Sequence, residues 1–225
     1  MGRAGTGTLT GFRDLFLLFL YPIKLIAAAG EHYLNTILDQ LVDFAGLMKN
    51  NVPVTLMLLA LFWGVFFISF LTGYRLNILG IYPRRFWGLP GIICSPFLHG
   101  DFNHLFFNSI PLFVLINFIL IEGLTRLIDI SLTIIILSGC AVWLLGRRAI
   151  HIGASGLIMG YFSYLLVNAY QHPSISSVIL AVVCLYYFGG FLLDLFPREE
   201  RVSWEGHLFG FLAGLAAVFI WSPHG

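Results

Sequence analysis

Long apolar runs separated by short polar stretches dominate the chain from residue 54 onward. Six runs stand out, and each is close to the roughly 20 residues that an α-helix needs to cross a bilayer. They are residues 54–71, 104–121, 130–146, 152–170, 175–193 and 206–221. Backbone groups in lipid must be satisfied within their own segment, so these runs are predicted to be helices. The pattern predicts an all-α, polytopic membrane helix bundle with six spans.

The first fifty residues follow a different pattern. Apolar side chains recur there at helical spacing with acidic and amide side chains off that face, namely Leu34, Ile37, Leu38, Leu41, Ala45 and Met48. This predicts an amphipathic helix lying on the membrane or against the bundle. Residues 15–29 are apolar but interrupted by Pro22 and Lys24, which favours a membrane-embedded or interfacial helix over a signal peptide. This segment could also form a seventh membrane span. We expect residues 1–50 to form a membrane-associated helical segment and residues 51–225 the main domain.

Composition agrees with a membrane protein. Hydrophobic residues make up 59% of the chain and charged residues 10%, too few charges to cover a water-facing surface. An ordinary soluble enzyme and a disordered chain are therefore excluded, and a net charge of +1 implies no nucleic-acid partner. Basic residues divide almost evenly between the two sides of the expected bundle, so they do not orient it.

Four polar side chains interrupt the apolar runs: His104 and Asn108 in the second, Ser155 in the fourth and His207 in the sixth. These three helices cross in the same direction, so their first turns open on the same face of the membrane. The four side chains should share a depth of roughly 5–10 Å. Each alone has a structural explanation, as a cap, an interfacial histidine or an interhelical bridge. Their coincidence at one depth favours a functional site.

Glycines bring two of these helices together. They lie around Ser155 and along the sixth run, namely Gly153, Gly156, Gly160, Gly206, Gly210 and Gly214. Small residues at every fourth position let helix backbones approach closely in lipid. That approach would place a serine hydroxyl within reach of the His207 imidazole, which could act as its base. Glu205 is expected to point away from His207, so a Ser–His dyad is favoured over a triad. No metal or other cofactor is expected.

The chain resembles the rhomboid family of intramembrane serine proteases over roughly residues 54–221. Three ordered motifs carry the resemblance: His99-x4-His104-x3-Asn108, Gly153-x-Ser155-Gly156 and Gly206-His207-x-x-Gly210. They look like the family signatures, in the family's order and on the matching helices.

The resemblance implies roles. Ser155 would be the nucleophile and His207 the base, His104 and Asn108 would line the oxyanion site with the Ser155 amide, and His99 would support the loop before the second helix. The fifth helix and residues 196–205 would form a gate. Substrates would be other transmembrane proteins, cut in or near a membrane-spanning helix. The protein would be a multi-pass protein of the cell membrane, with its active site toward the outside.

The chain departs from the family pattern at two places. A Trp-Arg pair common in the first loop is replaced by Pro90 and Gly91, so Arg84, Arg85 and Trp87 are candidates for its structural role. Met159 stands where members often have an aromatic residue that stacks on the base histidine.

Three other functions are less favoured. A catalytically inactive relative that binds membrane proteins usually lacks the serine or the histidine. A transporter would need polar residues through the full membrane depth. A metalloprotease using His99, His104 and His207 would need a His-Glu-x-x-His motif, which the chain does not have.

Overall fold

The computed structural model describes residues 12–188 and 203–221, which form helices, with no β-strand among them. The expected all-α class is therefore confirmed. The chain divides into two units, residues 1–44 and 45–225, each described by itself. Residues 189–202 lie outside the described part, and with them the end of the expected fifth span and most of the expected gate loop.

The first helix, α1 (Phe12–Leu71), runs for 60 residues without a break. It joins the amphipathic segment to the first apolar run, so the boundary expected between residues 50 and 51 falls inside a helix. Pro53 does not end it, because an apolar helix tolerates the loss of one backbone hydrogen bond. The apolar face before residue 44 is largely exposed, with Leu34, Ile37 and Leu38 all in the exposed class.

Four helices are long and apolar enough to cross a membrane: Gly30–Leu71 within α1, Phe102–Glu122, Leu124–Leu145 and Trp204–Trp221. The two other expected spans fall on α5 (Ser155–Gln171), which has 17 residues, and α6 (Ile175–Phe188), described over 14 residues. The described part of the chain is thus helical, with four candidate membrane spans, and six spans stay a prediction.

A compact loop connects α1 to the bundle. It contains three 3-10 turns and one short helix, namely η1 (Arg75–Leu79), η2 (Phe86–Gly88), α2 (Gly91–Cys94) and η3 (Ser95–Phe97). The Arg84 guanidinium donates to the Leu144 carbonyl at 3.0 Å, and the Trp143 indole donates to the Arg85 carbonyl at 3.0 Å. These two bonds fasten the loop to the end of α4 (Leu124–Leu145).

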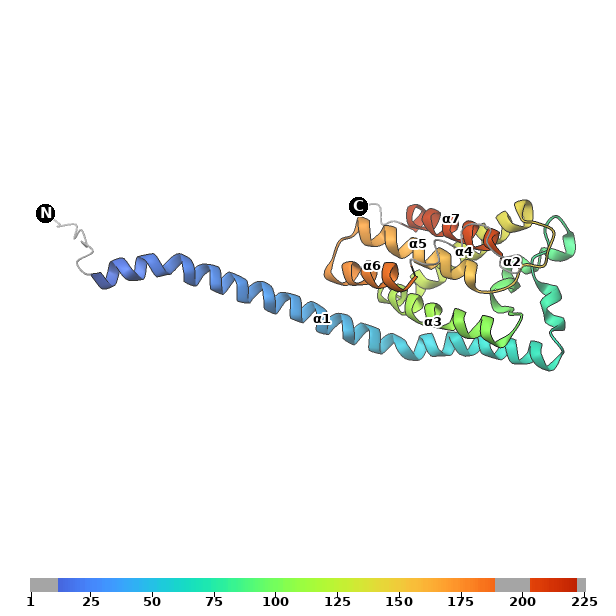
Figure 1. The fold of residues 1–225 in the computed structure, drawn as a ribbon, viewed down its shortest axis with the longest axis horizontal. Coiled ribbons are helices and arrows are strands. Elements are labelled where there is room, and N and C mark those ends of the chain that lie inside the picture. Colours follow the sequence, from blue (N-terminus) through green and yellow to red (C-terminus); the bar gives the residue numbers. More distant parts are fainter. Residues whose placement is uncertain (1–11, 189–202, 222–225) are drawn as a thin grey trace. The chain divides into compact units, whose positions relative to one another are not determined.

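The bundle consists of α3 (Phe102–Ile119), extended by η4 (Leu120–Glu122), then α4 (Leu124–Leu145), α5, α6 and α7 (Trp204–Trp221). α5 and α7 lie side by side and share the most extensive contact, and α4 packs against α7 as well (Figure 1). Large side chains fill the space between the helices, including Leu105, Leu112, Ile130, Ile134 and Phe162, all fully buried. The second half of α1 is held to α3 by a hydrogen bond of 3.2 Å from the Trp63 indole to Ser109.

A polar cluster joins four elements near the end of α3. The Glu122 carboxylate accepts hydrogen bonds from the Tyr164 hydroxyl at 2.8 Å and from the Asn168 amide at 3.0 Å. It also pairs with Arg126 at 3.5 Å, and Arg126 in turn donates to the Trp221 carbonyl at 2.7 Å. The cluster therefore ties η4, α4, α5 and the end of α7 together.

Candidate active site

Ser155 is the first residue of α5 and follows a loop held in an unusual backbone conformation. Gly153 has φ +116°, a region that side chains rarely adopt, and its amide donates to the Ser95 carbonyl at 2.9 Å. No side chain caps the helix at Ala154. The first amides of a helix have no intrahelical partner and carry the positive end of its dipole. The start of α5 therefore suits a developing negative charge next to the Ser155 hydroxyl.

α5 and α7 meet through the backbones of glycines. A Cβ atom added to Gly156 would lie 3.0 Å from the Gly206 carbonyl oxygen, and one added to Gly210 would overlap the Gly156 carbonyl. One turn farther, a Cβ at Gly214 would overlap the carbonyl of Gly160. The two helices can approach this closely only because these positions carry no side chain.

His207 lies in the first turn of α7, and its side chain is buried, with 8% exposed. The glycine contacts place it across from the start of α5, where Ser155 lies. No hydrogen bond joins Ser155 to His207 among the described contacts. Catalytic hydrogen bonds are often long without substrate and tighten only when it binds, so this geometry is compatible with a dyad.

His104 and Asn108 border the same site from α3. The His104 ring occupies the space over Gly153, because a Cβ there would lie 2.7 Å from the His104 Nε2 atom. The side-chain amide nitrogen of Asn108 would lie 3.9 Å from the same added Cβ atom. His104 and His207 are also close enough to interact electrostatically. His104, Asn108 and His207 therefore lie near one another. Ser155 follows Gly153, over which the His104 ring lies, by two residues.

His99 lies beneath this group, fully buried in the loop before α3. Its Nε2 atom lies 3.2 Å from the Asn108 amide nitrogen and 3.4 Å from the Ala154 amide nitrogen. The Ala154 amide can only donate, so Nε2 must be an acceptor and the imidazole proton sits on Nδ1. A neutral His99 therefore holds both the Asn108 side chain and the residue before Ser155. Burial, together with the nearby His104, lowers the pKa of His99 to about 4.

This lowered pKa predicts a dependence of stability on pH. Below pH ~6.5 the unfolded chain takes up a proton on His99 that the folded protein does not, so the free energy of unfolding should fall. Between that pH and the folded pKa of about 4 the loss should reach about 3 kcal/mol. We expect thermal unfolding in detergent to show a flatter pH profile for His99→Gln than for the wild type in this window. His172→Gln, at an exposed histidine, is the control; equal slopes for His99→Gln and wild type would contradict the prediction.

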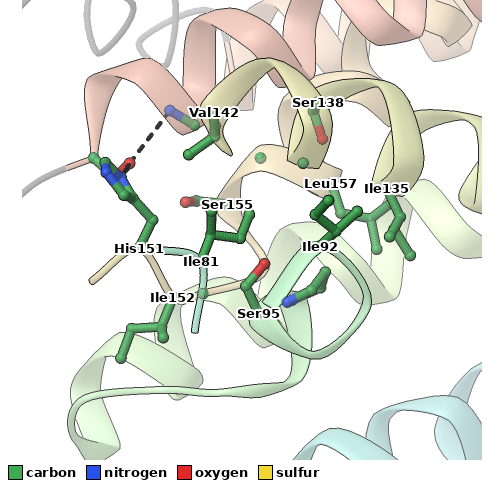
Figure 2. A pocket seen from close by; sticks show the side chains of 16 residues that line it. Ile81, Ile92, Ser95, Ile135, Ser138, Val142, His151, Ile152, Ser155 and Leu157 are labelled. Atoms are coloured by element: carbon green, nitrogen blue, oxygen red, sulfur yellow. Dashed lines mark hydrogen bonds between the residues drawn. The ribbon is translucent and has the colours of Figure 1, made fainter. Parts of the chain in front are cut away.

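A cavity of about 40 Å³ opens beside Ser155. Its wall combines apolar side chains such as Ile81 and Ile92 with the polar side chains of Ser95, Ser138 and His151. Figure 2 shows the Ser155 hydroxyl on the side of the cavity where His151 lies. This volume and the polar lining suit ordered water next to the Ser155 hydroxyl.

Residues that the sequence analysis did not single out complete the site. Ile81 and His151 form an isolated antiparallel bridge with amide-to-carbonyl distances of 3.0 and 2.9 Å. The Asn77 side chain donates to the His99 carbonyl at 3.2 Å. Arg147 pairs with Glu205 at 3.6 Å. No periodic pattern marks these loop residues, so spacing alone could not have found them.

The polar groups of the site do not form a metal centre. In the part of the chain that the structure describes, no group of three His, Cys, Asp or Glu side chains could hold a metal ion.

Comparisons with known proteins cover most of this region. The family model described as Rhomboid domain matches residues 83–224. An uncharacterized protein of Mycobacterium tuberculosis is 38% identical over 172 residues, covering 72% of this chain and 72% of its own. An uncharacterized protein of Mycobacterium leprae is 37% identical over 184 residues, covering 78% and 72%. A Bacillus subtilis protein with the provisional name rhomboid protease YdcA is 25% identical over 163 residues, covering 66% and 72%.

Proposed function

This chain belongs to the rhomboid family, whose members are typically intramembrane serine proteases, and we propose that it is an active one. It would cleave other transmembrane proteins in or near their membrane-spanning helix. One observation carries the proposal: the glycine backbones of α5 and α7 are in direct contact, which sets Ser155 and His207 at facing helix starts. His104 and Asn108 border the same point from α3.

In the proposed reaction the Ser155 hydroxyl attacks the scissile carbonyl while His207 takes the hydroxyl proton. The carbonyl oxygen becomes an oxyanion, which the amides at the start of α5 and the side chains of His104 and Asn108 stabilise. His207 then returns the proton to the leaving amine as the peptide C–N bond breaks. Water attacks the acyl-enzyme, and its proton passes through His207 back to Ser155.

We also propose the family's topology for this chain. α5 and α6 would supply the two spans beyond the four candidates, giving six in the main domain. The starts of α3, α5 and α7 would face the outside of the cell membrane. A catalytically inactive relative that only binds membrane proteins is the alternative, and no described contact favours it.

A gel assay tests the proposal directly. Purified protein in detergent should cleave a model transmembrane substrate and should react covalently with a fluorophosphonate probe. Ser155→Ala should abolish both reactions, because the probe and the substrate use the same oxygen. Ser109→Ala removes a hydroxyl on α3 whose hydrogen bonds within the described residues join it to Trp63 and the Leu105 carbonyl, and it should retain both reactions. Near-normal turnover by Ser155→Ala would refute a serine protease, and binding without cleavage by the wild type would favour the inactive relative.

A further inference from the structure

Two short segments, one before each member of the dyad, are fastened together. Residues 147–151 lead into the loop before Ser155, and residues 203–205 lead into His207. The His151 Nδ1 atom lies 2.6 Å from the Ser203 hydroxyl, and its Nε2 atom lies 3.0 Å from the Arg147 carbonyl. The Glu205 carboxylate accepts from the Arg147 amide at 3.3 Å and lies 3.6 Å from the Arg147 guanidinium. We call these four residues the clamp.

The donors and acceptors of the clamp have only one consistent arrangement with a neutral His151. The Arg147 carbonyl can only accept, so the His151 proton sits on Nε2 and Nδ1 accepts from the Ser203 hydroxyl. The Ser203 oxygen in turn accepts from the Gly206 amide at 3.3 Å, which makes Ser203 the N-cap of α7. A single chain of hydrogen bonds therefore runs from the first turn of α7 to the segment before Ser155. In this arrangement every hydrogen bond of the series pairs one donor with one acceptor.

Glu205 is the residue of the clamp whose burial destabilises the fold most. Only 4% of the residue is exposed, and its Oε2 atom is buried without a hydrogen-bond partner. A buried carboxylate with an unsatisfied oxygen destabilises a fold unless its partner compensates it. A neutral side chain of the same shape would avoid this cost, so bundle stability alone does not explain why a carboxylate is here. Glu205 stands two residues before His207 and bonds to Arg147 in the segment before Ser155, which points to a role in the site.

We propose that Glu205 and His151 are positioning residues that fix the separation between Ser155 and His207. The inference rests on the proposed function. His151, four residues before Ser155, bonds to Ser203, four residues before His207. Arg147, eight residues before Ser155, bonds to Glu205, two residues before His207. The glycine contacts let α5 and α7 approach, but they do not prevent α7 from sliding or rotating along them. The clamp holds the start of α7 at one register, and a displacement of about 1 Å can cost about 100-fold in rate.

The test separates positioning from general stability. Glu205→Gln and His151→Gln should each lower kcat for a transmembrane substrate by about 10–100-fold while KM changes less than about threefold. The rate of fluorophosphonate labelling at Ser155 should fall by a similar factor. Glu205→Gln combined with Arg147→Gln should be little worse than Glu205→Gln alone, because the two act as one unit.

The matched control is Glu122→Gln, which breaks the comparable Glu122–Arg126 pair at 3.5 Å in the polar cluster at the end of α3. It should lower the Tm in detergent and leave kcat unchanged. Ser203→Ala is the milder second variant if the clamp variants fold poorly, and it should lower kcat in the same way. Wild-type kcat in folded Glu205→Gln, His151→Gln and Ser203→Ala would overturn the positioning role alone. A wild type that neither cleaves nor takes up the probe would overturn the proposed function, and the positioning role with it.

Discussion

His207→Ala is expected to lower the turnover of a transmembrane substrate by about 10⁴–10⁶-fold, without preventing the protein from folding. A serine hydroxyl is a weak nucleophile near neutral pH, and removing its base removes both the attack step and the protonation of the leaving amine. His207 is buried in the first turn of α7, and no other imidazole lies on that helix. Cleavage followed on gels over several orders of magnitude in enzyme concentration would measure the loss.

The double variant Ser155→Ala, His207→Ala should be no slower than either single variant, since members of one catalytic unit are not additive. His172→Ala, at an exposed position after α5, should keep wild-type turnover and serves as the histidine control. Losses that multiply in the double variant would mean that the two residues act independently. In that case the assignment of His207 as the base of Ser155 would have to be abandoned.

Gly210→Ala should destabilise the protein by about 3 kcal/mol or more and reduce cleavage with it. The added methyl group would overlap the Gly156 carbonyl, which belongs to rigid helix backbone and cannot rotate away as a side chain could. α7 would have to move off α5, and His207 would move with it. Overpacked positions commonly cost 1–3 kcal/mol, and contacts with backbone leave the least room to adjust. Thermal unfolding in detergent, read beside substrate cleavage, would measure both effects.

Gly64→Ala is the control, and it should raise stability where Gly210→Ala lowers it. Gly64 lies in α1 with nothing within 4 Å of a Cβ atom, so Gly64→Ala should stabilise the helix by up to about 1 kcal/mol. The same chemical change would thus help one helix and harm another. Equal Tm shifts for Gly64→Ala and Gly210→Ala would contradict the direct backbone contact between α5 and α7.

Features that follow from helical periodicity were accessible from the sequence. The apolar runs predict an all-helical membrane protein, because lipid leaves the backbone few other options. The spacing of Gly156, Gly206 and Gly210 pointed to the α5–α7 contact, since small residues at every fourth position form one face of a helix. A count of crossings predicted one depth for His104 and His207, and this depth stays a prediction together with the six spans.

Features that depend on loops and helix continuity were not accessible. No local signal says that α1 continues through Pro53 and joins two differently patterned segments. The contact between His151 and Ser203 links residues 52 positions apart in non-repeating segments. Glu205 was expected to point away from His207, but its partner Arg147 could not be identified, because pairing across loops depends on the tertiary fold. The bonds of Arg84 and Arg85 also depend on the tertiary fold, since Arg84 donates to the Leu144 carbonyl and the Arg85 carbonyl accepts from the Trp143 indole.

The bridge between Ile81 and His151 bears on how small a working fragment of this protein can be. The family match begins at residue 83, so a fragment cut there would keep Ser155, His207, His104 and Asn108. It would lose both hydrogen bonds between Ile81 and His151 before Ser155, and the Asn77 amide that donates to the His99 carbonyl. It would also lose the half of α1 that hydrogen-bonds to α3. The smallest fragment that keeps these contacts thus extends beyond the family match, and its upstream limit lies in α1, before residue 63, whose indole bonds to α3.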